Sequence, residues 1–314
     1  MGVDDKRFVF VVGKGGVGKT TVSAALALRA AQAGKRVLVA QCNAKDRMGQ
    51  ALGVAPIGPQ LRNILPNLDA VNMAPDAALE EYGMMVLKVR ALYKVIFENR
   101  FVSAFLRGTP GLDAWAMLGK AQHHALEQID GQARYDLVIV DAPATGHGLD
   151  LLRVPKVIID VAPPGLLRRE AERAWSLFSD PQRAGVVLVS LPEDMPTNET
   201  LELHNALHNE LRLPIAALVV NGLLDPIFDA QDHNELTRLL QQAAPRSPLH
   251  TYLRTGQVRS QLEGIQRGCV QRLQAHIQAP LTELPQLSTR NLGPDQLQTL
   301  AACFATPENT NGVS

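Results

Sequence analysis

The segment GKGGVGKTT at residues 13–21 constrains the fold of this chain more than any other feature of the sequence. It follows a short β-branched run at residues 7–12 and opens a helical pattern that runs to about residue 33, just before Gly34, a typical residue after a helix C-terminus. Glycines in such a loop let successive backbone N–H groups approach an anion at a helix N-terminus. The order strand, loop, helix therefore predicts a site for nucleotide phosphates.

The residues of this loop that we expect to bind the nucleotide are Gly13, Gly15, Gly16, Val17, Gly18, Lys19, Thr20 and Thr21. Lys19 is expected to reach the β- and γ-phosphates, the Thr20 hydroxyl to ligate Mg²⁺, and Thr21 to lie near the α-phosphate. An ordinary phosphate-binding loop does not require Lys14, and a cation at that point can extend away from its own site. The alternative for Lys14 is a solvated loop lysine.

The wider pattern predicts an α/β fold with a doubly wound, mostly parallel sheet flanked by helices. Short, nearly all-apolar runs are typical of strands buried on both faces, and helical patterns between them imply right-handed crossovers. After residues 7–12, the predicted strands are residues 36–40, 135–140, 156–161, 185–191 and 215–220. We interpret residues 1–314 as one domain, with a second helix-rich stretch at about 229–278 and loops at about 56–66 and 243–248.

One region, residues 75–130, lacks strand patterns and is predicted to be a helical insertion at the strand ends, where ligands usually bind. Apolar residues there recur at spacings of three and four, as on one face of a helix: Leu79, Tyr82, Val86, Val89, Tyr93 and Ile96. Four of the seven methionines lie in or near it: Met73, Met84, Met85 and Met117. Methionine adapts to varied partners, so these helices form either a groove for a client or a local core.

A carboxylate, Asp141, ends the predicted strand at residues 135–140, after the apolar run LVIV. At that place it can hold Mg²⁺ or its water, so Thr20 and Asp141 are the predicted metal ligands. The sequence then continues APATGHG, and Gly146 within it can offer a backbone N–H to the γ-phosphate. A loop beside that phosphate can change shape when the phosphate leaves, so residues 142–148 are a candidate switch.

Composition narrows the class of protein. Lys plus Arg and Asp plus Glu both number 31, so the chain lacks the net positive charge of a non-specific nucleic-acid binder. Cys42, Cys269 and Cys303 lie too far apart for a short-spaced zinc or redox motif. The N-terminus does not resemble a signal peptide, and no apolar run is long enough to span a bilayer. These features favour a cytoplasmic protein without an integral membrane segment.

Two motifs together carry a family resemblance. GKGGVGKTT at 13–21 with DAPATGH at 141–147 resembles the arsenite-pump and tail-anchored-protein-targeting ATPases, which have a deviant-lysine loop. Further similar stretches are LDLLRVP at 149–155, MPTNET at 195–200, VVN at 219–221 and PGLD at 110–113. The resemblance covers about residues 7–300.

The resemblance implies a dimeric, Mg-ATP-hydrolysing protein with nucleotides at the subunit interface. Lys14 would cross that interface and contact the partner's nucleotide, and Asn221 would contact adenine. ATP would close the dimer and hydrolysis would open it. The partner subunit would be a second copy or a paralogue, and the helical insertion would present a surface to a client protein or a membrane transporter.

The chain departs from the family in its first switch loop. That loop usually reads DPAHS, with the Asp positioning the attacking water, whereas Asn43 takes the Asp position here. An amide can orient a water but cannot accept its proton. Hydrolysis would then be slow, recruit Asp46, or need a partner subunit. The alternative is a non-hydrolysing, nucleotide-dependent switch or scaffold.

Other departures bear on cargo and on related families. The clustered cysteines of the metalloid site and the CxxC zinc clasp of the targeting factors are absent from the sequence. Nitrogenase-type reductases need two cysteines in particular loops, and the three cysteines of this chain do not fall in those loops. Division-site ATPases carry an amphipathic C-terminal helix, whereas the C-terminal residues of this chain are polar. DNA-partition ATPases would be expected to have a basic face, which the neutral charge disfavours.

Overall fold

The computed structural model describes residues 2–45, 47–87, 111–143, 147–289 and 291–304. Within them, eight strands form one sheet in the order β10-β9-β8-β1-β7-β2-β4-β3. β3 is antiparallel to β4, and the other pairs are parallel. The strands in chain order are β1 Phe8–Val12, β2 Val37–Cys42, β3 Arg62–Leu65, β4 Leu68–Met73, β7 Leu137–Asp141, β8 Ala184–Ser190, β9 Ile215–Leu223 and β10 Leu281–Pro285.

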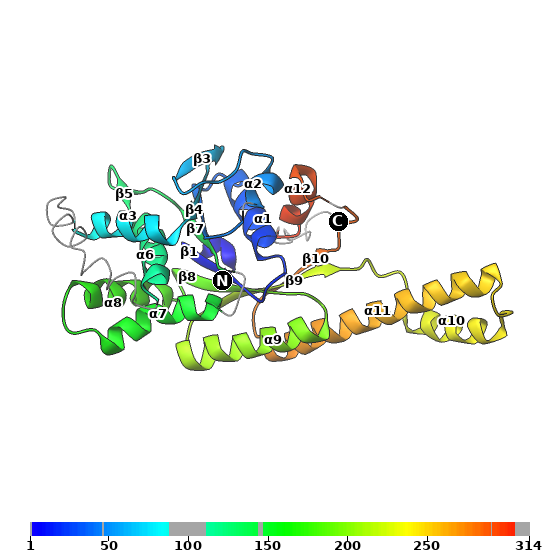
Figure 1. The fold of residues 1–314 in the computed structure, drawn as a ribbon. Coiled ribbons are helices and arrows are strands. Elements are labelled where there is room, and N and C mark those ends of the chain that lie inside the picture. The colour runs from blue at the N-terminus through cyan, green and yellow to red at the C-terminus, as the bar shows by residue number, and fades with distance from the viewer. Residues whose placement is uncertain (1, 46, 88–110, 144–146, 290, 305–314) are drawn as a thin grey trace, which may run out of the picture.

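Helices cover both faces of this sheet (Figure 1). The face that carries the side chains of Val9 and Val11 packs against α1 Lys19–Gln32, α2 Met48–Leu52 and α12 Pro294–Ala302. The other face carries Phe8 and Phe10 and is covered by the remaining helices of the body. These are α3 Pro75–Leu87, α6 Leu112–Leu126, α7 His147–Val161, α8 Leu166–Phe178, α9 Asp194–Asn205 with its π-helical continuation η2 Ala206–Leu211, and the end of α11 Pro248–His276.

The predicted doubly wound, mostly parallel sheet is confirmed. Every residue of β1, β2, β7 and β8 is buried, which explains why these strands read as continuous apolar runs in the sequence. Phe178 of α8 stacks on Phe8 and meets Phe10 edge-on, so an aromatic cluster joins the helix layer to the central strand. None of the described helices is long and apolar enough to cross a membrane.

The strand predicted at residues 156–161 is wrong, because these residues are the last turns of α7. Val157 and Val161 lie four residues apart on one side of the helix and are 53% and 74% exposed. With Leu167 of α8 they line a cavity of about 410 Å³. Ile158 and Ile159 are half-buried and pack against the core. The run is therefore apolar because one side of the helix end contacts the core and another borders a surface cavity.

The region predicted as a helical insertion holds α3 and α6 among its described residues, and the short strand β5 Gln128–Ile129, which pairs with β6 Gln132–Ala133 outside the main sheet. Val89, Tyr93 and Ile96 of the predicted apolar face lie outside the described residues. Met73 and Met117 belong to the core, which supports the local-core interpretation for these two, while Met84 is 39% exposed. Whether residues 75–130 act as a separate insertion stays a prediction.

Gly119 gives a test of the packing between α3 and α6. A Cβ at this position would lie 2.4 Å from the ring of Tyr82, which is itself held edge-to-face against Trp115. Overpacking costs about 1–3 kcal/mol, which exceeds the gain of about 1 kcal/mol from replacing a helical glycine. We expect Gly119→Ala to lower the free energy of unfolding by about 1–2 kcal/mol, measured by urea denaturation.

The matched control for this substitution is Gly264→Ala. Gly264 lies in α11, and no atom lies within 4 Å of the place that a Cβ would occupy, so only the helix-propensity gain applies there. We expect that variant to be as stable as the parent or slightly more stable. Equal stability changes in the two variants would contradict the close packing of Tyr82 on Gly119.

Candidate phosphate-binding site

The loop between β1 and α1 is shaped by close contacts that exclude side chains at two glycines. A Cβ at Gly18 would lie 2.3 Å from the side-chain nitrogen of Asn221, and one at Gly13 would lie 2.3 Å from the carbonyl oxygen of Val189. Gly18 also has φ of 94°, in the left-handed region that favours glycine. The loop is therefore held against the carboxyl ends of β8 and β9, and α1 begins directly at Lys19.

A cavity of about 820 Å³ opens beside this loop at the carboxyl edge of the sheet. Residues from four segments far apart in the sequence line it: residues 16 and 18–21 of the loop and α1, residues 42–45, 47, 50 and 51 at and after the end of β2, the end of β7 with Ala142 and Pro143, and the pair Asn291–Leu292 before α12. Parallel strands end at the same edge of a sheet, and the order β1-β7-β2 makes the first three of these segments neighbours. The cavity has the position expected for a ligand of an open α/β sheet.

Lys19 lies against the backbone of its own loop. Its Nζ donates hydrogen bonds to the carbonyl oxygens of Gly13 at 3.0 Å and Lys14 at 2.8 Å. The side chain is buried, and this burial lowers the pKa of Lys19, while the carboxylate of Asp141 acts in the opposite direction. A cation held here faces the cavity and can neutralise phosphate oxygens.

Asp141 is the centre of a buried polar cluster. It accepts hydrogen bonds from the Thr20 hydroxyl at 2.8 Å, the Ser23 hydroxyl at 3.2 Å and the Gln41 amide at 3.5 Å. Burial raises the pKa of Asp141, and these donors and the charge of Lys19 oppose the rise. Thr20 and Asp141, which the sequence paired as metal ligands, thus lie in direct contact. Ser23 and Gln41 were not anticipated.

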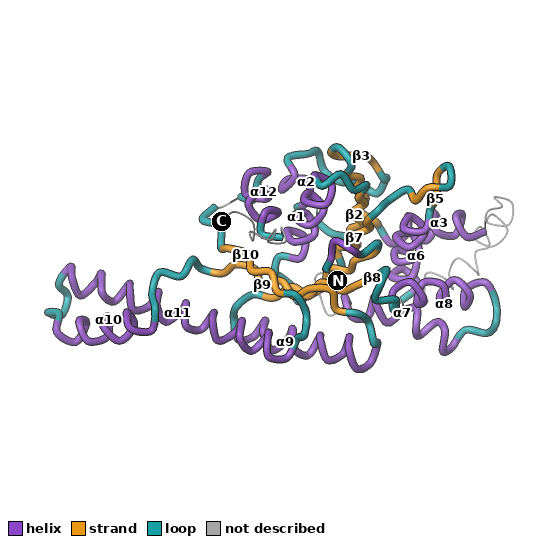
Figure 2. Tube along the Cα trace, turned by 180° about the vertical axis from the view of Figure 1, so that it is seen from behind, coloured by secondary structure: helices purple, strands orange, loops and turns teal. Residues whose placement is uncertain are grey.

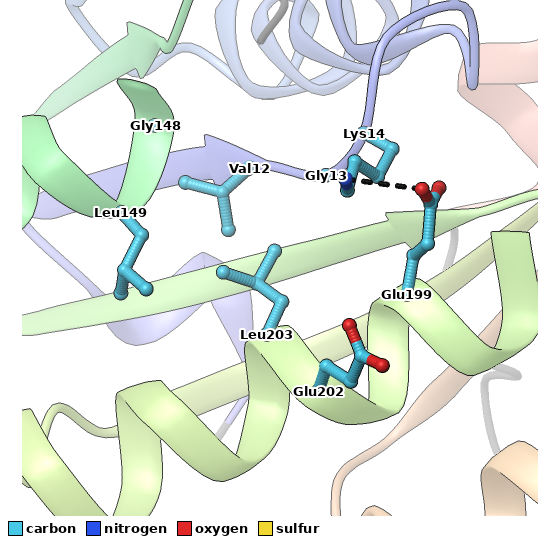
Figure 3. Close-up of a pocket in the computed structure, with 8 residues that line it drawn as sticks. All are labelled: Val12, Gly13, Lys14, Gly148, Leu149, Glu199, Glu202 and Leu203. Atoms are coloured by element: carbon cyan, nitrogen blue, oxygen red, sulfur yellow. Dashed lines mark ion pairs between the residues drawn. The ribbon is translucent and has the colours of Figure 1, made fainter. Parts of the chain in front are cut away.

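Lys14 points away from the 820 Å³ cavity. Its ammonium forms an ion pair with Glu199 of α9 at 3.0 Å (Figure 3). A smaller cavity of about 180 Å³ lies at this place, and Leu149 of α7 and Glu202 and Leu203 of α9 border it with Lys14. The two lysines of the loop therefore lie on different sides of it. Lys19 lines the 820 Å³ cavity, and Lys14 lies on the side of the loop that contacts α9.

Asn43 follows β2 and lines the large cavity with an exposed side chain. Its backbone is in the left-handed region with φ of 49°, which asparagine tolerates better than most residues. Asn72 fixes the next residue, because its side chain accepts from the Ala44 N–H at 3.0 Å and donates to the Ala44 carbonyl at 2.7 Å. Asp46 and Gly146, the other predicted residues of the two switch segments, lie outside the described residues.

Asn221 lies behind the loop. Its side-chain nitrogen donates to the carbonyl oxygen of Val17 at 3.0 Å, and Val17 itself is buried beneath the loop. This contact connects β9 to the phosphate loop. The predicted contact between Asn221 and adenine stays a prediction.

Several residues that line the cavity were missed from the sequence: Lys45, Arg47, Gln50, Asn291 and Leu292. Lys45 and Arg47 flank Asp46, so their closeness to a predicted switch residue could have indicated them. Asn291 and Leu292 had no such signal, because only the return of the chain from β10 to α12 brings them to this edge.

Comparison with known families agrees with this geometry. The family model described as anion-transporting ATPase matches residues 6–162, half of the chain. The chain belongs to the anion-transporting ATPase family. The matched region contains β1, the phosphate loop, Asn43, Asp141 and the whole of α7, so it includes three of the four segments that line the large cavity.

Individual relatives extend the similarity beyond residue 162. ATPase BagA of Mycobacterium tuberculosis is 30% identical over 232 residues, which cover 72% of this chain and 68% of that protein. The arsenical pump-driving ATPase of Escherichia coli is 29% identical over 242 residues, 72% of this chain and 41% of that protein. ATPase GET3 of Kluyveromyces lactis is 26% identical over 262 residues, 72% of this chain and 74% of that protein.

Proposed function

We propose that this chain is an Mg-ATP-dependent ATPase that works as a dimer, either with a second copy or with a paralogue. The observation that carries the proposal is the 820 Å³ cavity, which gathers the phosphate loop, Lys19, Thr20 and Asp141 at one edge of the sheet. Membership in a family of ATPases supports the choice of ATP. The loop's N–H groups and Lys19 would bind the phosphates.

The residues present fit a magnesium ion. The Thr20 hydroxyl and the Asp141 carboxylate are 2.8 Å apart, and both border the cavity. Mg²⁺ prefers oxygen ligands and usually takes one or two from the protein and the rest from phosphates and waters. When bound, the ion would neutralise charge on the β- and γ-phosphates. Thr20 would be its direct ligand, and Asp141 would hold it or one of its waters.

Lys14 is the residue that ties catalysis to dimerisation in this proposal. It lies on the outer side of its own loop and is 44% exposed, so it is accessible to a second subunit. In trans it would reach the partner's nucleotide and stabilise the negative charge of the transition state, as an arginine finger does. For that contact to form, Lys14 must leave Glu199.

The attacking water would be oriented by Asn43, with Asp46 as a second candidate. Asn43 lines the cavity at the carboxyl end of β2. An amide can hold a water through hydrogen bonds but cannot take its proton, so turnover would be slow. This feature keeps a second candidate function in view, a nucleotide-dependent switch or scaffold that binds ATP without hydrolysing it.

The output of the cycle would be a change in the dimer that is passed to a client protein or to a membrane transporter. The described residues directly after β2 and β7 border the proposed nucleotide cavity, so the shape of these segments would follow the nucleotide state. The Escherichia coli relative is an arsenical pump-driving ATPase, which supports a transporter as one candidate partner. The missing cysteine cluster weighs against metalloid cargo.

Replacing Asn43 by Asp tests the proposal and separates it from the switch alternative. A carboxylate at this position can accept a proton from water, and general-base groups contribute about 10²–10⁴-fold to rates. We expect Asn43→Asp to raise kcat at least about tenfold with little change in KM, measured as phosphate release from Mg-ATP. Asn234→Asp, an exposed asparagine of α10 Ala230–Gln242, is the matched control.

The outcomes separate the two functions. Slow turnover by the parent that increases in Asn43→Asp supports the ATPase. ATP binding by the parent without turnover, followed by turnover in the variant, supports the switch. No ATP binding by either protein would contradict both proposals.

A further inference from the structure

Helices α10 and α11 form a hairpin that projects from the body of the molecule (Figures 1 and 2). The end of α11 nearest the body is anchored in the core by Val270 and Leu273. The outer end, where the two helices are joined, extends well beyond the sheet in both views. We define residues 243–254, the connecting loop and first turns of α11, as the hairpin tip.

The base of the hairpin is held in a fixed orientation. Glu263, which is 3% exposed, accepts hydrogen bonds from the backbone N–H groups of Ile227 and Phe228, and Arg259 pairs with it at 2.7 Å. These contacts connect α11 to the segment that leads from β9 into α10. The tip is therefore carried on a supported arm and has a defined position relative to the nucleotide-binding body.

Charge is segregated along this arm. The acidic residues gather at the base: Asp225, Asp229, Asp232, Glu235 and Glu263. No Asp or Glu occurs from Leu236 to Leu262, although the whole chain has equal numbers of acidic and basic residues. Arg238 and Arg259, at the two ends of this stretch, pair with Glu235 and Glu263. Arg246 and Arg254 of the tip have no carboxylate in that stretch to pair with.

The tip also exposes large apolar side chains. Leu249 and Tyr252 lie one turn apart at the start of α11 and are 60% and 76% exposed. Ser247 caps this helix by accepting a hydrogen bond from the His250 N–H at 3.1 Å, so the first turn is well formed. Leu249 and Tyr252 therefore form a small apolar surface at the far end of the arm that a second surface could cover.

Other exposed apolar residues of α11 do not belong to this surface. Val258, Leu262 and Ile265 are about half exposed, but helical periodicity places them on the opposite side of α11 from Leu249 and Tyr252. They also lie nearer the body. The tip is thus a separate surface, in which two apolar anchors are flanked along the chain by two arginines.

We propose that the hairpin tip docks end-on on the surface of an anionic lipid bilayer. Leucine and tyrosine are suited to the boundary between headgroups and acyl chains, where the tyrosine hydroxyl stays in water. Arginine binds phosphate oxygens in a forked geometry. Arg246 lies in the loop just before the first turn of α11. Arg254 lies about one and a half turns behind Leu249 and on the opposite side of the helix, so in an end-on orientation its long side chain would extend toward the headgroups beside the helix. An acid-free tip on a neutral chain matches the negative charge of such a surface.

The test is flotation of the full chain with vesicles of phosphatidylglycerol and, separately, of phosphatidylcholine. We expect binding to the anionic vesicles and little binding to the neutral ones. Each basic residue near an anionic surface contributes about fivefold to partitioning, so Arg246→Gln/Arg254→Gln should bind about 25-fold more weakly. Leu249→Ser/Tyr252→Ser should lose binding while keeping both charges.

The matched control is Arg169→Gln/Arg212→Gln, which removes two exposed arginines outside the hairpin and should bind like the parent. Thermal denaturation checks that all variants are folded. Three results would overturn the proposal: no binding to anionic vesicles, equal binding to both kinds of vesicle, or equal loss in the tip and control variants. Binding of an oligonucleotide that the tip substitutions abolish, without vesicle binding, would assign the tip to nucleic acid instead.

This proposal goes beyond the proposed ATPase function and does not depend on it. The tip lies far from the nucleotide cavity, so Lys19→Ala should keep vesicle binding even if it loses ATP. Failure of vesicle binding with intact ATP hydrolysis would remove the tip proposal alone. Vesicle binding by a chain that does not bind ATP would remove the ATPase proposal alone.

Discussion

Lys19→Ala is expected to abolish measurable binding of Mg-ATP. Lys19 is a buried cation that lines the cavity. It is the first residue of α1 and lies beside the N–H groups of the loop. Hydrogen bonds to charged groups contribute about 1.5–3 kcal/mol each, so losing two of them to phosphate oxygens weakens binding on the order of 100-fold or more. Titration with a fluorescent ATP analogue measures the loss.

The Lys19→Ala experiment needs two controls, one for folding and one for nonspecific loss of charge at the cavity. Lys19 donates to two backbone carbonyls of its loop, so the alanine variant also loses contacts that shape the loop. A thermal melt must therefore show that the variant is folded. Lys45→Ala is the matched control, because Lys45 lines the same cavity on an exposed loop and should change affinity only severalfold. Unchanged ATP affinity in Lys19→Ala would contradict the proposal that this cavity binds the phosphates of ATP.

The centre of the candidate site could be predicted because its functional residues lie in short continuous segments of the sequence. The phosphate loop occupies adjacent positions, and Asp141 ends an apolar run that reads plainly as a buried strand. Parallel strands then bring both segments to one edge without further information. The contact between Thr20 and Asp141 follows from these two facts.

Residues supplied by long-range packing could not be predicted in the same way. Asn291 and Leu292 reach the cavity only because β10 pairs with β9 and the chain then crosses back to α12. Ser23 lies one turn into a helix, where a serine has no distinctive pattern, and its bond to Asp141 depends on how α1 packs on β7. The partner of Lys14, Glu199, comes from α9, a helix far along the chain.

Five of the six apolar runs predicted as strands correspond to β1, β2, β7, β8 and β9, and one run was misleading. Residues 156–161 contain four apolar side chains in six positions, as a buried strand does, but they form the last turns of α7 beside a surface cavity. Conversely, β4 mixes buried and half-buried residues and β3 has no buried residue, so neither strand had a continuous apolar run. A short apolar run records burial or a cavity-facing surface, and periodicity over so few residues does not separate the two.

Lys14→Ala is expected to keep ATP binding and to lose turnover. A residue that only binds the nucleotide would instead change the affinity for ATP and leave kcat unchanged. Lys14 does not line the large cavity, so its removal should change affinity little. A cation supplied across an interface contributes about 10³–10⁵-fold to phosphoryl transfer. We therefore expect kcat to fall by about 10³-fold or more at unchanged KM, measured as phosphate release. Glu199→Gln, which removes the partner of Lys14 but keeps its shape, should leave turnover intact or raise it.

Mixing two inactive variants tests whether Lys14 acts across the interface. A Lys14→Ala subunit keeps its binding site, and a Lys19→Ala subunit keeps Lys14. If Lys14 acts in trans, a mixed dimer has one complete site, built from the Lys19 of the first subunit and the Lys14 of the second, and mixing should restore turnover. If Lys14 acts within its own subunit, neither chain can complete a site, and the mixture should stay inactive. If activity is restored and rises with the concentration of the second variant, the result would establish both the dimer and the role of Lys14. An inactive mixture that still binds ATP would limit the proposal to nucleotide binding by single subunits.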